Sequence, residues 1–120
     1  MTDKHDVRRH ALAMPGATEA DESFEFRRAG RLFINPYPER IDPRKPRVAR
    51  YDQFVIRVAN ADDKEALLAG EPAVFFTTGH YNGWATVIVR LDQIDDERLG
   101  SLLRDAWEAA PSSSKLKRPV

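Results

Sequence analysis

Apolar residues recur at a helical spacing in three segments of the chain. The first helix is expected over residues 3–14, with Thr2 as its cap and a buried stripe formed by Val7, His10, Ala11 and Met14. A second is expected over residues 61–69, after the capping side chain of Asn60. The third begins near Asp95 and ends before Pro111, with a stripe formed by Leu99, Leu102, Leu103, Ala106, Trp107 and Ala110. These stripes predict three helices that each bury one face.

Between the first two helices the pattern changes to the two-residue alternation that is typical of β-strands. Residues 24–27 and 31–35 alternate in this way on either side of Ala29 and Gly30, which predicts a hairpin. Residues 36–46 follow and contain four prolines. Because proline has no amide donor for a strand ladder, we expect this segment to be a loop or a projecting wing.

The remaining strands are short. Residues 48–51 and 54–58 predict two strands with a tight turn between them, and residues 73–77 and 84–91 predict two more. Residues 17–23 are small and acidic, so we expect an exposed connection there. No internal repeat is visible, and the order of elements gives no sign of alternating strand and helix units.

The order of elements predicts the fold class. Strands joined by turns, with helices near both ends and one in the middle, favour an α+β domain with a single antiparallel sheet and helices packed on one face. A chain of 120 residues is the usual size of one domain. We therefore expect one domain over residues 1–111 and a frayed tail over residues 112–120.

Three blocks of residues are similar to one known family. They are Met14-Pro15-Gly16, Gly30-Arg31-Leu32-Phe33, and a longer and more specific block that runs from Phe75 through Thr77-Thr78-Gly79-His80-Tyr81-Asn82-Gly83-Trp84 to Leu91. Over nearly its whole length the chain resembles the MmcQ/YjbR family. The resemblance implies a fold likened to a double-wing DNA-binding motif and to frataxin-like α/β domains, and it implies no established reaction. Residues 36–46 replace a shorter connection of the family, which affects any inherited surface beside them.

The formal charge is zero but unevenly distributed, and this raises the possibility of a basic surface. Residues 27–57 contain nine basic and three acidic side chains, while residues 58–110 contain four basic and ten acidic ones. Arginine side chains on hairpins can fork onto phosphate oxygens, so a nucleic-acid site is one hypothesis. The alternative is an ordinary solvated face. The candidate DNA-contacting residues are Arg27, Arg28, Arg31, Arg40, Arg44, Lys45, Arg47 and Arg50.

A second hypothesis comes from the aromatic and polar side chains between the last two predicted strands. Rings and an imidazole can enclose a small ligand or contact a protein partner. The alternative is structural, because Asn82 and Gly83 alone form a strong hairpin-turn signal. The candidate ligand-binding residues are Thr77, Thr78, His80, Tyr81, Asn82 and Trp84. The first hypothesis makes DNA the partner, and the second a protein or a small ligand.

Other site classes find little support. The chain has no cysteine, which excludes disulfides and thiolate sites. His5 and His10 fall on different faces of the first helix, and the acidic residues near Asp3 and Asp95 are typical of helix starts, so we expect no metal and no cofactor. No nucleophile elbow or phosphate-binding glycine loop is present, so we expect a protein that is not an enzyme. Without an apolar run long enough for a membrane span, we expect a cytoplasmic protein.

Overall fold

The computed structural model describes residues 2–112 and 115–116, and within them the chain forms one six-stranded antiparallel sheet and three α-helices. In spatial order the strands are β1 (Ala17–Glu19), β2 (Phe26–Arg28), β3 (Arg31–Glu39), β4 (Val48–Arg57), β6 (Thr86–Arg90) and β5 (Phe75–Phe76). The helices are α1 (Lys4–Leu12), α2 (Ala61–Gly70) and α3 (Asp96–Ala109), with short 3-10 turns η1 (Gly79–Tyr81) and η2 (Leu91–Gln93). The predicted α+β class with a single antiparallel sheet is confirmed.

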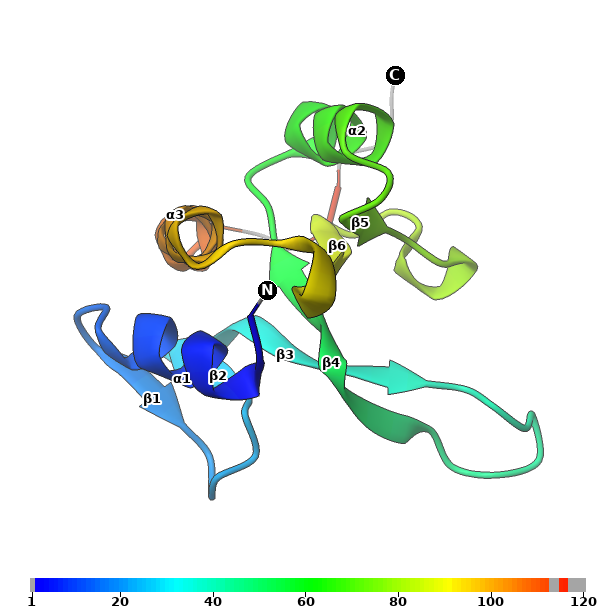
Figure 1. Cartoon of the computed structure of the whole chain (residues 1–120), viewed down its shortest axis with the longest axis horizontal. Helices are drawn as coiled ribbons and strands as arrows, with labels where there is room; N and C mark the ends of the chain where they lie inside the picture. Colours follow the sequence, from blue (N-terminus) through cyan, green and yellow to red (C-terminus); the bar gives the residue numbers. More distant parts are fainter. Residues whose placement is uncertain (1, 113–114, 117–120) are drawn as a thin grey trace.

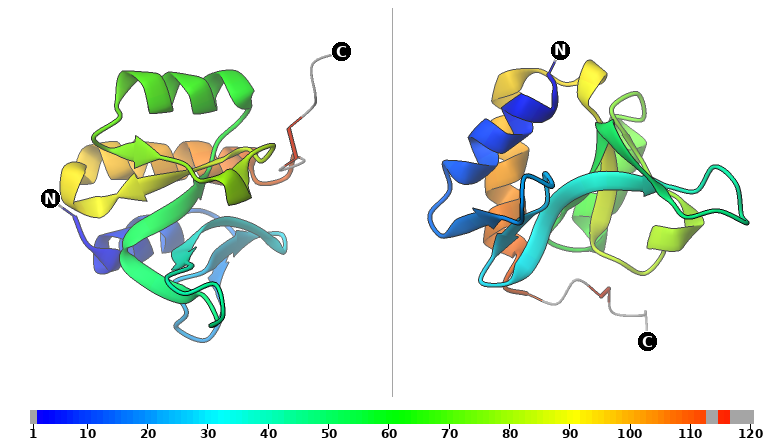
Figure 2. Two further views of the ribbon diagram at one scale, coloured as in Figure 1. Left: turned by 90° about the vertical axis from the view of Figure 1, so that its right-hand side faces the viewer. Right: turned by 90° about the horizontal axis from the view of Figure 1, so that it is seen from below.

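The main core lies between one face of the sheet and the helices. Alternate residues of β4, Phe54 and Ile56, are 0% and 1% exposed and join Leu99 and Leu103 of α3 in this core. Helices α1 and α3 lie side by side over it (Figure 1), and α2 lies beyond β5 and β6 on the opposite side from α1 (Figure 2). Leu67 and Leu68 of α2 pack against the same core as α1 and α3, so the prediction of helices packed on one face is confirmed.

The opposite face of the sheet, called here the open face, carries a second and smaller cluster. Val55 and Ile88 are buried there beside Tyr37, and the partly buried rings of Phe76 and Tyr81 pack against them. Among the described residues no α-helix contributes to this cluster. A loop covers part of the open face instead, and this leaves room for a cleft.

The three predicted helices are present, and two of their caps are the predicted ones. The side chain of Asn60 accepts the amide of Asp63 at 2.8 Å and so caps α2. At the start of α1, however, the cap is Asp3 and not Thr2. The Thr2 hydroxyl instead donates to the carbonyl oxygen of Leu91 at 3.0 Å, which ties the start of the chain to η2.

The strands differ from the prediction at three places. β1 lies within residues 17–23, where we expected an exposed connection, because its backbone pairs with β2. β3 continues through Pro36 and Pro38, beyond the point at which it pairs with β2, so the missing proline amides leave no gap between two strands. The predicted turn at residues 52–53 is also wrong. β4 is continuous, and a register irregularity beside Pro36 takes up the extra residues.

The far halves of β3 and β4 form a projecting arm. Its base lies at the register irregularity, and from there Tyr37 pairs with Arg50 and Glu39 with Val48. Figure 1 shows this arm extending away from the helices, with residues 40–47 at its tip. The expected wing is therefore present, but its loop is limited to residues 40–47, because residues 36–39 belong to β3.

Residues 77–84 form a structured loop, called here the aromatic loop, between β5 and β6. η1 occupies its centre, and the amide of Trp84 donates to the carbonyl oxygen of Tyr81 at 3.1 Å to close a turn. Asn82 has φ −60° and ψ 132°, and Gly83 has φ +81°, which is the geometry of a type II turn. Asn82 and Gly83 do form a turn, but it is not a two-residue turn joining the strands, which end several residues away.

The described part of the C-terminal tail contacts this loop. Lys115 makes an antiparallel bridge with Trp84, and the amide of Leu116 donates to the carbonyl oxygen of Gly83 at 2.8 Å. The other residues of the predicted frayed tail, apart from Ser112, lie outside the described residues. Lys115 and Leu116 thus make a short strand-like contact within the segment that the sequence predicts to be a frayed tail.

Candidate functional site

The eight basic residues proposed from the sequence fall into two groups at opposite ends of β3. Arg27, Arg28 and Arg31 lie on or beside the β2–β3 hairpin at one end. The other five, Arg40, Arg44, Lys45, Arg47 and Arg50, lie on the projecting arm. Figure 1 shows the arm directed away from β2. The structure therefore does not bring the eight side chains together on one surface.

Most cations of the arm are bonded to the arm itself. Arg50 donates to Glu39 at 2.6 Å and to Asp52 at 3.0 Å, and these hydrogen bonds raise the pKa of Arg50. Arg40 and Arg47 donate to backbone carbonyl oxygens, that of Lys45 at 2.9 Å and that of Pro38 at 3.1 Å. Arg44 reaches Asp42 only at 3.5 Å. The tip thus has four basic side chains and one carboxylate, that of Asp42, and two of its arginines are already bonded to backbone oxygens.

The basic residues of the β2–β3 hairpin are held by the body of the protein. The guanidinium of Arg28 lies 3.8 Å from the centroid of the Trp107 ring and donates to the carbonyl oxygen of Trp107 at 2.9 Å. Arg31 donates to the carbonyl oxygen of Ser112 at 3.3 Å, and Arg27 pairs with Glu25 at 3.3 Å. Arg28 in particular joins the sheet to the end of α3, which is a structural role.

The aromatic loop, by contrast, forms one wall of a cleft of about 370 Å³ on the open face. This wall consists of His80, Tyr81 and Trp84, which are three of the predicted ligand-binding residues. The floor is formed by the strands, through Asn35, Val55, Arg57 and Thr86, and Leu32 and Phe33 complete the lining. We call this space the open-face cleft. Thr77, Thr78 and Asn82, also proposed from the sequence, do not line it.

A buried lysine that the sequence analysis missed holds the aromatic loop in place. Lys64 on α2 is only 8% exposed, and its Nζ donates to the carbonyl oxygens of Tyr81 and Trp84, both at 2.8 Å. Burial lowers the pKa of Lys64. The His80 and Tyr81 rings meet edge to face, with centroids 4.8 Å apart. Tyr81 and Trp84 are thus held through their backbone, and His80 is held by ring contact with Tyr81.

The floor of the open-face cleft contains an unpartnered polar atom. The hydroxyl oxygen of Thr86 is buried and is the one buried side-chain polar atom of the described residues that lacks a hydrogen-bond partner. Thr86 pairs across the sheet with Arg57, which is 4% exposed and donates to the carbonyl oxygens of Val58 at 3.3 Å and Ser112 at 3.0 Å. Because buried polar groups normally have partners, the Thr86 hydroxyl indicates a place for a ligand or a water.

A larger cleft, of about 580 Å³, lies between α2 and α3, and the sequence analysis did not predict it. Its lining contains the carboxylates of Asp63, Asp105 and Glu108 together with Arg98 and Arg57, and Arg57 lines the open-face cleft as well. Arg98 is already paired with Glu71 at 2.7 Å. The lining carries both positive and negative charges, and none of the described residues that form it has a buried polar atom without a partner. This interhelical cleft therefore gives less indication of a ligand than the open-face cleft does.

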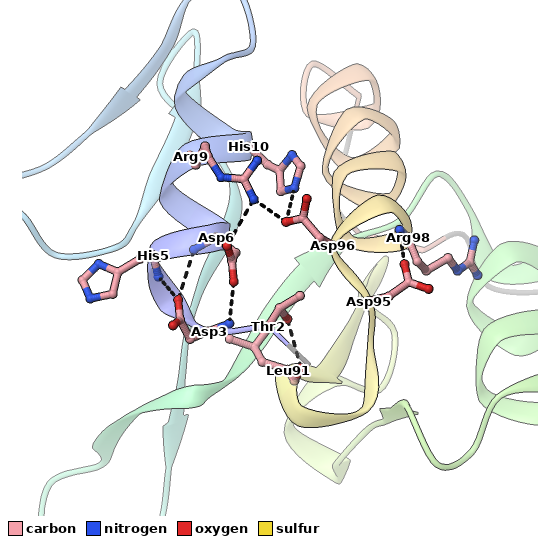
Figure 3. Close-up of polar contacts among 10 residues, drawn as sticks. All are labelled: Thr2, Asp3, His5, Asp6, Arg9, His10, Leu91, Asp95, Asp96 and Arg98. Carbon is pink, nitrogen blue, oxygen red and sulfur yellow. Dashed lines mark hydrogen bonds and ion pairs between the residues drawn. The ribbon is translucent and has the colours of Figure 1, made fainter.

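The acidic residues at the helix starts have structural partners (Figure 3). Asp3 and Asp6 form a reciprocal capping box at the start of α1, and Asp95 accepts the amide of Arg98 at 2.7 Å at the start of α3. Asp96 joins the two helices, because it accepts from Arg9 and lies 2.9 Å from Nε2 of His10. These two basic groups lower the pKa of Asp96. The cluster is explained by capping and helix packing.

The described residues contain neither a metal-binding cluster nor a membrane-spanning helix. Within residues 2–112 and 115–116, no three His, Asp or Glu side chains come close enough together to hold a metal ion. Over the same residues, none of the helices has the length and apolar character that crossing a membrane requires.

The family relationship follows from comparison of the sequence with known proteins. A family profile described as YjbR matches residues 12–109, which include the whole sheet, α2 and α3. The chain belongs to the YjbR family. This YjbR chain is also 44% identical over 52 residues to uncharacterized proteins of Mycobacterium tuberculosis (Rv2570) and Mycobacterium bovis (Mb2600), a match over 43% of this chain and 40% of each relative. It thus spans less than half the length of these relatives, and no solved structure matches it.

Proposed function

We propose that this YjbR-family domain is a binding protein that takes a small molecule into the open-face cleft, without a catalytic step. The observation that carries the proposal is the buried hydroxyl of Thr86, which lacks a partner on the floor of a cleft walled by aromatic rings. A buried hydroxyl without a hydrogen bond is unfavourable by about 1–3 kcal/mol. A ligand that supplies the missing hydrogen bond would recover that free energy on binding.

The size and the lining of the cleft support the same proposal. Its volume of about 370 Å³ lies within the range of roughly 300–1,000 Å³ that is usual for small-molecule sites. Such sites combine apolar walls with a few well-placed polar groups. Here His80, Tyr81 and Trp84 provide the walls, and the polar groups come from the strands. Trp84 is 43% exposed, which is high for so large an apolar side chain, and a bound ring would cover part of it.

Two tryptophans with different surroundings make the proposal testable by NMR. The chain contains only Trp84 and Trp107. Trp84 lines the open-face cleft, whereas the indole N–H of Trp107 donates to the carbonyl oxygen of Pro15 at 2.9 Å, away from it. In a fragment screen on ¹⁵N-labelled protein, we expect ligands to shift the indole signal of Trp84 and to leave that of Trp107 in place. Trp84→Phe assigns the signals.

The control for this screen is a variant outside the cleft. Tyr51 is exposed on the arm at 43%, as Trp84 is, and does not line the cleft. Tyr51→Ala should bind every hit as the parent protein does, while Trp84→Ala should weaken binding at least fivefold. Hits that move Trp107 as strongly as Trp84, or that bind equally well to Trp84→Ala, would contradict the proposal.

DNA binding is a second candidate, and the projecting arm is the observation that favours it. The arm is a two-stranded ribbon with Arg44 and Lys45 at its tip, and the Arg44 side chain is 90% exposed. Ribbons of this kind can enter a DNA groove. Against it stand the ion pairs of Arg50 with Glu39 and Asp52, which already occupy one of the candidate phosphate contacts. The small-molecule proposal therefore comes first.

Fluorescence anisotropy with labelled duplex and single-stranded DNA at two salt concentrations distinguishes the two candidates. If the arm contacts phosphates, binding should weaken by about 0.9 log units per log unit of salt for each contact. The combined variant Arg44→Ala, Lys45→Ala and Arg47→Ala should then lose binding, while Trp84→Ala should keep it. Affinity that is the same in this triple variant and in the parent would exclude the arm as a DNA site.

A further inference from the structure

The open-face cleft also has features that select the chemical class of its ligand. Resting on the proposed function above, we infer that this cleft binds a planar aromatic ring that carries a carboxylate group, with the carboxylate at Thr86 and Arg57 and the ring against Trp84. Three observations lead to this assignment: the sign of the charge in the cleft, the donors on its floor and the rings in its wall. Each is taken in turn below.

The charge of the cleft lining has one sign. Among the described residues that line the cleft, Arg57 alone is permanently charged. None of these residues is an aspartate or a glutamate. A second cation lies close by, because Arg31 donates to the same Ser112 carbonyl oxygen as Arg57 does, at 3.3 Å and 3.0 Å. Burial lowers the pKa of Arg57, and repulsion from Arg31 lowers it further. An anion in the cleft is favoured by this field, and a cation is opposed by it.

The floor supplies hydrogen-bond donors next to each other. Thr86 and Arg57 are direct partners across β6 and β4, so the hydroxyl and the guanidinium lie on neighbouring strands at the same level of the sheet. A hydroxyl can donate its proton to a carboxylate oxygen, and the guanidinium of Arg57, which already donates to the carbonyl oxygens of Val58 and Ser112, contributes its positive charge beside it. The carboxylate would give Thr86 the partner that it lacks. A neutral amide in its place gains less, because hydrogen bonds to a charged acceptor are the stronger ones.

The wall favours a flat apolar group on the same ligand. The Trp84 ring is exposed, and the His80 and Tyr81 rings lie edge to face beside it, so a planar ring can stack or meet these faces at an angle. The wall is also rigid at this point, since Lys64 holds the carbonyl oxygens of Tyr81 and Trp84. The interhelical cleft, although larger, offers charges of both signs and no such rings.

A matched pair of probes tests the assignment. Indole-3-acetate and indole-3-acetamide have the same ring and nearly the same shape, and they differ in whether the acid group is charged. We expect the acid to shift the Trp84 indole signal with a dissociation constant at least fivefold lower than that of the amide, because hydrogen bonds to the neutral carbonyl oxygen of the amide are weaker than those to a carboxylate. The Trp107 signal should remain in place with both probes.

Substitutions at Thr86 provide the second half of the test. Thr86→Val keeps the shape of the side chain and removes the hydroxyl, so the fold should be retained. We expect it to weaken binding of the acid at least fivefold and to weaken binding of the amide by a clearly smaller factor. Thr86→Ser restores a hydroxyl and should recover most of the affinity for the acid. Tyr51→Ala again serves as the control outside the cleft.

The outcomes separate this inference from the proposed function. If the acid and the amide shift Trp84 with equal affinity, the cleft binds small molecules but has no preference for carboxylates, and the inference is overturned alone. If Thr86→Val binds the acid as tightly as the parent does, the assigned place of the carboxylate is wrong. If neither probe moves Trp84 and the fragment screen also fails, both the inference and the proposed function are overturned.

Discussion

The ammonium group of Lys64 lies 2.8 Å from the carbonyl oxygen of Trp84 and 2.8 Å from that of Tyr81, so one side chain of α2 fixes both ends of the turn beside the open-face cleft. Each of these carbonyl oxygens would lose this hydrogen bond if the lysine were replaced. The position of the cleft wall therefore depends on a residue that does not line the cleft.

Replacement of Lys64 by methionine should loosen this wall. The variant keeps much of the side-chain volume but leaves two carbonyl oxygens without the ammonium donor, so we expect it to lower the free energy of unfolding by about 1–3 kcal/mol. Urea denaturation measures this loss, and broadening of the Trp84 indole signal would report the mobile wall. Glu65→Met, at the exposed neighbouring position of α2, is the control and should change stability little. Equal stability of the Lys64 variant and this control would contradict the role of Lys64.

The pair of Arg8 and Glu19 should make stability depend on pH. Arg8 donates to both carboxylate oxygens of Glu19, at 2.8 Å and 2.7 Å, and this hydrogen bonding lowers the pKa of Glu19 from its ordinary value of 4.5. The unfolded chain therefore binds more protons than the folded one just below pH 4.5, so stability falls as the pH falls through the lowered pKa. At higher pH this contribution is fully present.

Denaturation midpoints measured from about pH 3 to about pH 7, a range that includes the ordinary pKa of glutamate, test this effect. Glu19→Gln should be less stable than the parent at neutral pH, and the difference should shrink as the pH falls. Glu25→Gln is the matched control, because Glu25 pairs with Arg27 at 3.3 Å in a more exposed position. A difference between Glu19→Gln and the parent that stays constant across this range would show that Glu19 does not titrate as argued.

The turn between β2 and β3 should accept a stabilising substitution. Ala29 and Gly30 both have positive φ, +50° and +79°, as a two-residue hairpin turn of type I′ requires. Alanine is strained in this region, whereas asparagine tolerates it better. We expect Ala29→Asn to raise the free energy of unfolding by about 0.5–1 kcal/mol and Gly30→Ala to lower it by about 1 kcal/mol. Thermal denaturation checks both, and a loss of stability in Ala29→Asn would contradict the assigned turn.

Gly100 in α3 should not tolerate alanine. A Cβ atom there would lie 2.8 Å from Cε1 and 2.9 Å from Nδ1 of His10, so α1 and α3 could not keep their present contact. We expect Gly100→Ala to lower the free energy of unfolding by about 1–3 kcal/mol, although alanine is the better helix former. In a double-mutant cycle, His10→Ala should remove part of the penalty. Additive effects of the two substitutions would rule out this contact as the cause.

Local rules predicted the elements where side chains alone decide them. Asn60 and Asp95 are caps because their oxygens accept amides three residues ahead, which is a property of the sequence. β1 could not be predicted in this way, since three small and polar residues form a strand there only through pairing with β2. The same holds for Pro36 and Pro38, which fit in β3 because β2 has already ended.

The candidate site was predicted in part for similar reasons. His80, Tyr81 and Trp84 were identified from their residue types, and they do line one cleft. Lys64 was missed because a lysine on a polar helix gives no signal in the sequence, and its burial depends on where the aromatic loop lies. Arg57 was not predicted as a site residue. Its one distinguishing feature in the sequence is that it is a charged residue in an otherwise apolar part of β4, and many other arginines lie near it in the sequence.

The bridge between Lys115 and Trp84 also affects how the chain should be produced for binding studies. Truncation after residue 111, where the sequence suggests that the domain stops, would remove the backbone neighbour of Trp84 and the hydrogen bond from Leu116 to Gly83. A fusion tag attached at this terminus would lie close in sequence to the residues that make these contacts with the turn. Affinities measured on shortened or C-terminally tagged protein would then describe an altered pocket, so tags belong at the other end.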